Sequence, residues 1–199
     1  MDQLLQQLIN GISLGSIYAL IALGYTMVYG IIQLINFAHG DVYMVGAYVG
    51  YFSMAVLKLD FFSSLLIAMV ACTILGVVIE RVAYKPLRNS TRIAVLITAI
   101  GVSLLLQYGM MYFVGAGGRA YPPLPAFLTQ SWQLGPVVLR MQQVIIVVVS
   151  VTLMLVLQFI VRRTRMGKAM RAVSQDADAA RLMGISVDNT ISFTFALGS

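Results

Sequence analysis

The first residues that could do chemistry form the segment Gly11-Ile12-Ser13-Leu14-Gly15, which has the G-x-S-x-G pattern of serine hydrolases. A serine nucleophile in that pattern needs a strand, a sharp turn and a helix, with a histidine and a carboxylate converging on it. His39 is the only histidine of the chain, so an enzyme here would depend on Ser13 and His39. The segment opens a long apolar run instead of following a strand, which argues against a hydrolase.

The same segment contains two glycines four residues apart. Gly11 and Gly15 form a G-x-x-x-G pair, and Gly46 and Gly50 repeat the spacing. Small residues at this interval let the backbones of two helices approach closely. We therefore interpret these four glycines as helix-packing positions.

The composition is that of a membrane protein. Of the 199 residues, 60% are hydrophobic and only 10% are charged, and the mean hydropathy is +0.90. A soluble domain usually carries about 25% charged residues, so lipid must meet most of the exterior. The single cysteine, Cys72, lies in an apolar run and excludes a disulfide framework within the chain.

Asn36, His39 and Asp41 form the only concentrated polar group of the first fifty residues. Ionisable groups at membrane depth are costly and often mark a transport path. At a membrane face the same residues would make a turn or cap the second helix. There the positive end of the helix dipole would favour the Asp41 carboxylate. Both interpretations stay open. His39 and Asp41, two residues apart and without further ligands, make a poor metal site, so we expect no metal.

Apolar runs of about 20 residues predict an all-α, polytopic transmembrane bundle. We predict five complete spans and the start of a sixth, at residues 10–32, 41–57, 61–79, 93–114, 143–161 and 191–199. The last run stops after nine residues, so we expect residues 1–199 to be a single membrane domain that is truncated at its C-terminus. Residues 33–40 either turn at the membrane surface or re-enter the membrane.

Basic residues predict the orientation. Lysines and arginines gather in residues 81–92 and again in residues 162–190, and two predicted spans separate these segments. Both segments therefore lie on one side, which the positive-inside rule makes cytoplasmic. Counting back along the spans places the N-terminus outside.

Residues 162–190 carry an amphipathic helical pattern. Its apolar stripe consists of Met166, Met170, Val173, Ala177, Ala180 and Met183, and Gly184 is a natural helix stop. Small and flexible residues suit an adjustable contact with another protein. A helix lying on lipid headgroups would show the same pattern, and the pattern alone does not separate the two.

Several segments resemble one family of permeases. Asp178-Ala179-Ala180-x-x-x-Gly184 resembles the EAA loop of ABC-importer permeases, with Asp in place of the first Glu. Residues 10–48, 80–88 (ERVAYKPLR) and 163–172 (RTRMGKAMRA) are similar, in the same order, to branched-chain amino acid permeases of the LivH type. Members of this family continue with further helices and a Gly-rich segment.

The resemblance implies a permease subunit of an ATP-driven importer in a bacterial-type inner membrane, translocating branched-chain or related amino acids. The implied partners are a second homologous permease, two cytoplasmic ATPases and an external substrate-binding protein. The chain has no P-loop, so it cannot itself cradle ATP phosphates in that way. The resemblance implies a transporter subunit and not an enzyme, with no cofactor bound directly and with ATP used by the partner subunits. The residues implied to contact the ATPase are Met170, Val173, Asp178, Ala179, Ala180 and Gly184. The alternatives are a permease for urea or short amides, an intramembrane serine hydrolase and an ATP-independent channel.

Overall fold

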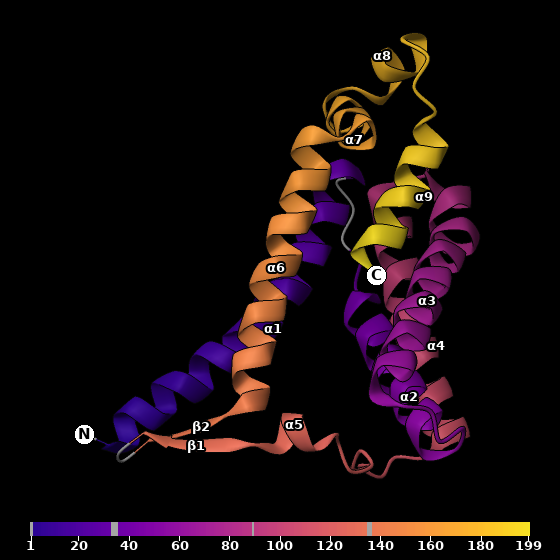
Figure 1. Cartoon of the computed structure of the whole chain (residues 1–199). Coiled ribbons are helices and arrows are strands. Elements are labelled where there is room, and N and C mark those ends of the chain that lie inside the picture. Colours follow the sequence, from indigo (N-terminus) through magenta and orange to yellow (C-terminus); the bar gives the residue numbers. More distant parts are fainter. Residues whose placement is uncertain (1, 33–35, 89, 135–136) are drawn as a thin grey trace.

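The computed structural model describes residues 2–32, 36–88, 90–134 and 137–199. Long helices dominate it (Figure 1). In chain order, its first half consists of α1 (Asp2–Ile32), α2 (His39–Ala55), α3 (Phe61–Ile79), the π-helical turn η1 (Glu80–Tyr84), the 3₁₀ turn η2 (Lys85–Leu87) and α4 (Arg92–Val114). The second half consists of α5 (Ala126–Thr129), β1 (Ser131–Leu134), β2 (Val137–Arg140), α6 (Met141–Arg163), α7 (Arg165–Gln175), α8 (Ala177–Leu182) and α9 (Val187–Gly198).

Local sequence signals set several helix ends. The Asp60 carboxylate accepts a hydrogen bond from the Ser63 amide at the start of α3, and the Thr91 hydroxyl accepts one from the Ala94 amide at the start of α4. Such side chains satisfy amide groups that a helix leaves unpaired at its N-terminus. Gly115 ends α4 with a φ of +96°, a conformation that glycine adopts without steric cost.

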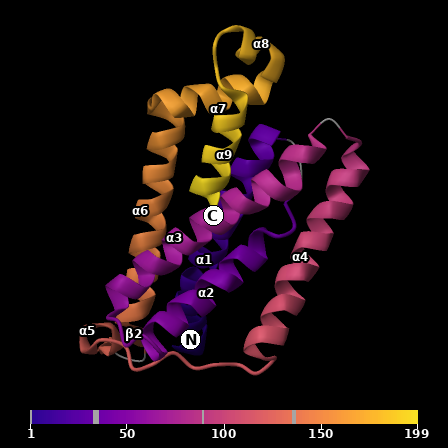
Figure 2. The same ribbon diagram turned by 90° about the vertical axis from the view of Figure 1, so that its right-hand side faces the viewer.

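The long helices form two groups that α9 joins. α1 packs along α6, while α2, α3 and α4 form the second group (Figures 1 and 2). α9 contacts both α1 and α3, and glycines make these contacts close. A Cβ at Gly24 of α1 would approach the Gly198 carbonyl oxygen to 2.7 Å, and a Cβ at Gly76 of α3 would overlap Ser199.

One part of the chain departs from the all-α prediction. β1 and β2 form an antiparallel hairpin in which Ser131 pairs with Arg140. The Gln6 side chain of α1 holds it, donating to the Val138 carbonyl at 3.1 Å and accepting from the Val138 amide at 2.9 Å. The ladder and the Gln6 side chain thus pair backbone groups of the connection between α4 and α6.

The polar segments lie at opposite ends of the bundle. The hairpin lies near the N-terminus at one end, and α7 and α8 lie beyond the other end (Figure 1). The connection from α3 to α4, which includes η1 and η2, is at the same end as α7 and α8 (Figure 2). The two basic segments of the sequence are therefore on the same side of the bundle, as their charges predict.

Four of the predicted spans coincide with helices that are long and apolar enough to cross a membrane. Within the described residues these helices are Gln3–Ile31, Phe61–Leu87, Ile93–Val114 and Met141–Arg163. Their apolar side chains remain largely outside the fold, and Tyr112 and Phe113 of α4 are each 84% exposed. This exterior suits hydrocarbon rather than water. The chain is thus a multi-pass helical membrane protein. The predicted span 41–57 corresponds to α2, which has only 17 residues.

Candidate functional site

A buried carboxylate joins α2 to α4. Asp41, in the first turn of α2, is only 8% exposed. Its Oδ2 accepts a hydrogen bond from the Ser103 hydroxyl at 2.5 Å, and its Oδ1 accepts one from Gln107 Nε2 at 2.9 Å. The ion pairs found among the described residues do not include Asp41. We call Asp41, Ser103 and Gln107 the Asp41 cluster.

The Asp41 cluster lies at the depth of the middle of a membrane helix. Ser103 is the central residue of the 23-residue α4. Because Asp41 contacts Ser103, α2 begins level with the centre of α4 instead of at its end (Figure 2). The prediction of a complete second span at 41–57 needs this correction. Helices that begin inside the membrane layer are tolerated where protein surrounds them, and in transporters they commonly build the transport site.

Two of the residues before α2 are also buried. The Asn36 side-chain oxygen accepts hydrogen bonds from the Tyr84 hydroxyl at 3.0 Å and from the Ala38 amide at 3.1 Å. Asn36 and Ala38 are 5% and 0% exposed. Of the segment 33–40, residues 33–35 lie outside the described residues. In the described part Asn36, Ala38 and His39 are buried, whereas Phe37 and Gly40 are exposed.

Asp41 does not cap α2, although it lies in the first turn of the helix, near the positive end of the helix dipole, and residues 37–38 form a turn before it. Ala38 occupies the N-cap of α2 and no side chain caps it, while the oxygens of Asp41 are bonded to α4. His39 is buried near α1: its ring lies 6.3 Å from the Tyr25 ring, centroid to centroid, and packs against Gly24. Within the described residues, no three His, Cys, Asp or Glu side chains gather into a metal-binding group.

The G-x-S-x-G segment lies inside the continuous helix α1. It therefore lacks the strand and sharp turn that would expose Ser13 as a nucleophile. A Cβ on Gly11 or Gly15 would meet no other atom of the described chain within 4 Å. By contrast, a Cβ on Gly46 would overlap Cys72 Sγ of α3, and one on Gly50 would approach the Tyr121 hydroxyl to 3.0 Å. The second pair thus packs inside the chain and the first pair does not.

Residues 162–190 contain two separate helices, α7 and α8, between the end of α6 and the start of α9, where the sequence predicts one continuous stripe. α7 ends at Asp176, whose carboxylate accepts hydrogen bonds from the Asp178 and Ala179 amides at 2.9 Å and starts α8. Aspartate competes in this way with a continuing helix. The chain turns at this residue, so the predicted stripe is divided between two helices.

The two helices bury part of the predicted stripe within the chain itself. Met170, Val173 and Ala180 are 1%, 5% and 4% exposed, and the last two join the core formed with α3, α4 and α9. Asp178, Ala179 and Gly184 are exposed. The prediction that one apolar face of the segment is free for a partner is therefore corrected, because Met170, Val173 and Ala180 face inward.

The exposed tip of this segment carries two large apolar side chains, of which the predicted stripe contains only Met183. Leu182 is 89% exposed and Met183 is 82% exposed. Gly184 follows with a φ of +81°, and the amides of Gly184 and Ile185 donate to the carbonyls of Arg181 and Ala180. This is a Schellman ending, and it confirms the left-handed C-cap predicted for Gly184. The cap holds Leu182 and Met183 at the tip.

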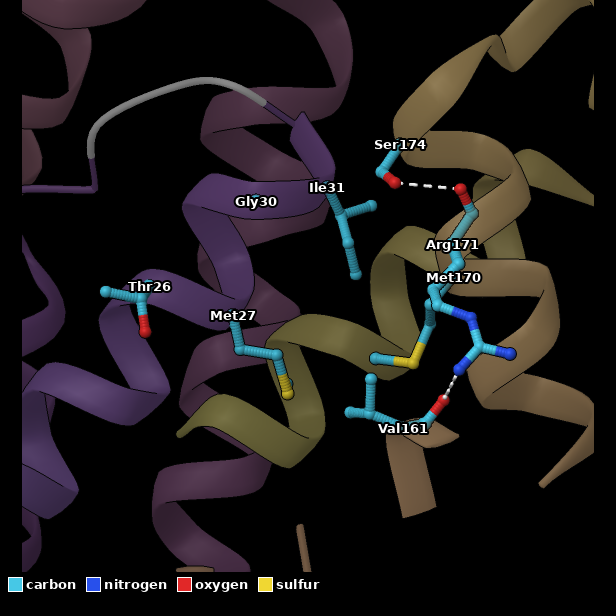
Figure 3. A pocket seen from close by; sticks show the side chains of 8 residues that line it. All are labelled: Thr26, Met27, Gly30, Ile31, Val161, Met170, Arg171 and Ser174. Atoms are coloured by element: carbon cyan, nitrogen blue, oxygen red, sulfur yellow. Dashed lines mark hydrogen bonds between the residues drawn. The ribbon is translucent and has the colours of Figure 1, made fainter. Parts of the chain in front are cut away.

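A shallow hollow separates α7 from α1. Figure 3 shows Thr26, Met27, Gly30 and Ile31 of α1 on one side, with Val161 of α6 and Met170, Arg171 and Ser174 of α7 on the other. Its volume is about 200 Å³ and its walls are mostly apolar. Arg171 donates to the Val161 carbonyl at 3.0 Å and so ties α7 to the end of α6.

A cluster of charges that no sequence pattern indicates lies at the same end of the bundle. Glu80 of η1 is 0% exposed, and it pairs with Arg88. Arg88 and Lys85 both pair with Asp188 in the first turn of α9. Lys85 Nζ lies 2.9 Å from Asp188 Oδ2. The hydrogen bond from Lys85 and the nearby Arg88 charge hold the pKa of Asp188 below its ordinary value of 3.8. Arg88 and Asp188 are 100 positions apart in the chain, so no local sequence pattern predicts this cluster.

Comparisons with known proteins agree with this architecture. Residues 7–199 match the family described as the branched-chain amino acid transport system / permease component. The chain is 42% identical over 205 residues to the high-affinity branched-chain amino acid transport system permease protein BraD of Pseudomonas aeruginosa, covering 98% of this chain and 67% of that protein. It is 43% identical over 208 residues to the permease protein LivH of Escherichia coli K12, with the same coverage. No solved structure matches the chain.

The chain is a bundle of long apolar helices with a buried polar cluster and a polar helical segment at one end. Together with the family match, this architecture defines a multi-pass membrane permease. More particularly, the chain belongs to the family of branched-chain amino acid transport permease components, which are transport subunits and not enzymes.

Proposed function

We propose that this chain is the membrane-spanning permease subunit of an ATP-driven importer that translocates branched-chain amino acids across a bacterial-type inner membrane. The names of its relatives support the substrate class. The observation that carries the ATP-driven mechanism is the exposed apolar tip, Leu182 and Met183, which a capped helix holds beyond the end of the bundle. Large apolar side chains so exposed at a polar membrane face mark a contact with another protein.

The proposed partner at this tip is a cytoplasmic ATPase. Asp178, Ala179 and Gly184 lie on the exposed side with Leu182 and Met183, and together they would enter a groove on the ATPase. Met170, Val173 and Ala180 would instead attach the segment to the membrane helices. The complete assembly we propose adds a second homologous permease, a second ATPase and an external substrate-binding protein.

The proposed orientation has the N-terminus outside and residues 81–92 and 162–190 in the cytoplasm. In this orientation the chain makes five complete passes and the start of a sixth, and residues 36–38 and α2 together belong to the second pass. We also propose that residues 1–199 form one membrane domain, with residues 162–190 as its coupling segment.

The proposed transport path passes the Asp41 cluster. A carboxylate at mid-membrane depth without a cationic partner is costly, and it would be stabilised by the ammonium group of a passing amino acid. The irregular backbone at residues 36–38 brings polar groups to the same depth. ATP-driven closure of the ATPases would move the coupling segment and rock the two groups of helices between outward and inward access.

The test is uptake by the assembled transporter in proteoliposomes, with ATP enclosed and labelled leucine outside with the binding protein. We expect ATP-dependent uptake that excess unlabelled leucine suppresses and excess urea does not. Suppression by urea alone would favour a permease for urea or short amides. Uptake that needs no ATP would contradict the importer and favour a channel.

A matched pair of variants tests the proposed contact. Leu182→Asp places a charge at the tip and should abolish ATPase binding while leaving the fold intact, because the side chain is exposed. Lys58→Asp, in the α2–α3 connection at the opposite end, is a control at another exposed position and should retain ATPase binding. Normal ATPase binding by Leu182→Asp would show that this tip does not contact the ATPase.

A further inference from the structure

The charges at the end of α3 form one connected arrangement. The two oxygens of Glu80 are both engaged: Oε1 pairs with Arg88 and Oε2 accepts a hydrogen bond from the Ser192 hydroxyl at 2.7 Å. The two oxygens of Asp188 are engaged as well, Oδ1 by Arg88 and Oδ2 by Lys85. We call Glu80, Lys85, Arg88, Asp188 and Ser192 the charged bridge. It joins the η1–η2 segment to α9.

The central pair of the charged bridge is protected from water. Glu80 is completely buried and the side chain of Arg88 is only 18% exposed. A buried pair gains little stability over an apolar pair, but loss of one partner strands the other charge and is strongly unfavourable. The arrangement therefore resists any separation of η1 from α9.

The contact continues along one side of α9. Asp188, Ser192, Phe195 and Ser199 recur at steps of four, three and four residues, which places them on one helix face. Phe195 packs on the Tyr84 ring with 5.4 Å between centroids, and Ser199 lies against the site of Gly76. α9 is thus attached to α3 and η1 at four successive levels.

The other end of residues 162–190 is attached to a different group of helices. Arg171 bonds to the end of α6, and a Cβ on Gly167 would overlap the Ile160 and Val161 carbonyl oxygens, so α7 is fixed against α6. Between these two attachments lie the extended residue Asp176 and the short helix α8. A displacement of α8 must change the relation between the α6–α7 group and the α3–α9 group.

From this geometry we propose that Glu80, Arg88 and Asp188 are positioning residues that pass a displacement of α8 to α3 by keeping α9 and η1 together during transport. The inference rests on the proposed function, in which a partner ATPase displaces α8. Without the charged bridge, only the contacts of Phe195 and Ser199 would hold α9 to η1 and α3, and part of a displacement of α8 would be lost before it reached α3. ATP hydrolysis would continue and less transport would follow it.

The experiment measures leucine uptake and ATP hydrolysis in the same proteoliposomes of the assembled transporter. Arg88→Gln should reduce uptake per ATP hydrolysed by about tenfold, a magnitude common for coupling between sites, while ATP hydrolysis persists. Arg81→Gln is the matched control, since Arg81 is an exposed arginine of the same segment that makes no ion pair among the described residues. It should keep the wild-type ratio.

A reversible link separates a mechanical role from a loss of folding. In a Cys72→Ala background, Lys85→Cys and Asp188→Cys are introduced together with Arg88→Gln and joined by a short thiol-cleavable cross-linker. Linking should restore uptake per ATP, and dithiothreitol should abolish it again. The milder variant Asp188→Asn, whose side chain is half exposed, should shift the ratio in the same direction as Arg88→Gln.

Two results would overturn the inference: a wild-type ratio in both Arg88→Gln and Asp188→Asn, or a defect that cross-linking leaves unchanged. Failure of the proposed function is distinguishable, because the unmodified transporter would then show no ATP-dependent uptake at all.

Discussion

The carboxylate of Asp41, in the first turn of α2, accepts a hydrogen bond from the amide of Gln107 at 2.9 Å, although 66 residues separate them along the chain. Few other contacts hold α4, which packs mainly on α2 and η1. The Asp41 cluster therefore holds α4 against α2, and it also places polar groups in the interior of the bundle.

We predict that Gln107→Leu destabilises the protein by about 1.5–3 kcal/mol, because it removes a donor from a buried carboxylate. The measurement is the unfolding free energy in detergent. Gln133→Leu, an exposed glutamine on β1, is the control and should change stability by less than about 0.5 kcal/mol. Equal effects of the two changes would show that Asp41 does not depend on Gln107.

Gly184 should tolerate only residues that accept a left-handed backbone. At a φ of +81° we expect Gly184→Val to cost about 1–2 kcal/mol or more locally, and Gly184→Asn less. The Schellman ending would loosen, so trypsin should cleave after Arg181 faster in Gly184→Val than in the parent protein. Gly118→Val, in an open part of the long loop, is the control. An unchanged cleavage rate in Gly184→Val would contradict the role of the cap.

The sequence predicts the long helices well, because apolar runs and charge breaks act locally. The third predicted span, 61–79, has the same bounds as α3, since Asp60 caps its start and the polar residues from Glu80 onward follow it. The glycine stop at Gly184 is equally local. These features depend on neighbours within a few residues, which a single sequence displays.

The relationships between distant residues could not be predicted in this way. Asp41 is placed by Ser103 and Gln107, and Glu80 is bonded to Arg88 and Ser192. Likewise, Met170 and Val173 look free on a helical pattern, and tertiary packing covers them. An amphipathic pattern shows that a face is apolar and does not show which partner covers it.

Gly46 should be sensitive to a single added methyl group. We predict that Gly46→Ala destabilises the protein by about 1–3 kcal/mol, because the new Cβ overlaps Cys72 Sγ in a packed interface. Removal of that sulfur should relieve the overlap, so Gly46→Ala should cost less in a Cys72→Ala background. The coupling between the two changes is measured by a double-mutant cycle in detergent.

Gly15→Ala is the matched control for this cycle. Its Cβ meets no described atom, and alanine favours a helix over glycine by about 1 kcal/mol. The expected change in the isolated protein therefore has the opposite sign to that of Gly46→Ala. An additive cycle for Gly46 and Cys72 would mean that the two residues do not limit the approach of α2 to α3.

Asp188 should contribute to stability in a defined range of pH. Its pKa in the folded protein is lowered below 3.8 by the hydrogen bond from Lys85 and by the charge of Arg88. A lowered folded pKa means that the contribution is complete above the unfolded value and is lost as the pH falls through the folded value. The difference in Tm between the parent protein and Asp188→Asn should therefore be constant from about pH 7 to 5. It should shrink below pH 3.8. A difference that already shrinks between pH 7 and 5 would mean that another group, and not Asp188, carries the interaction with Lys85 and Arg88.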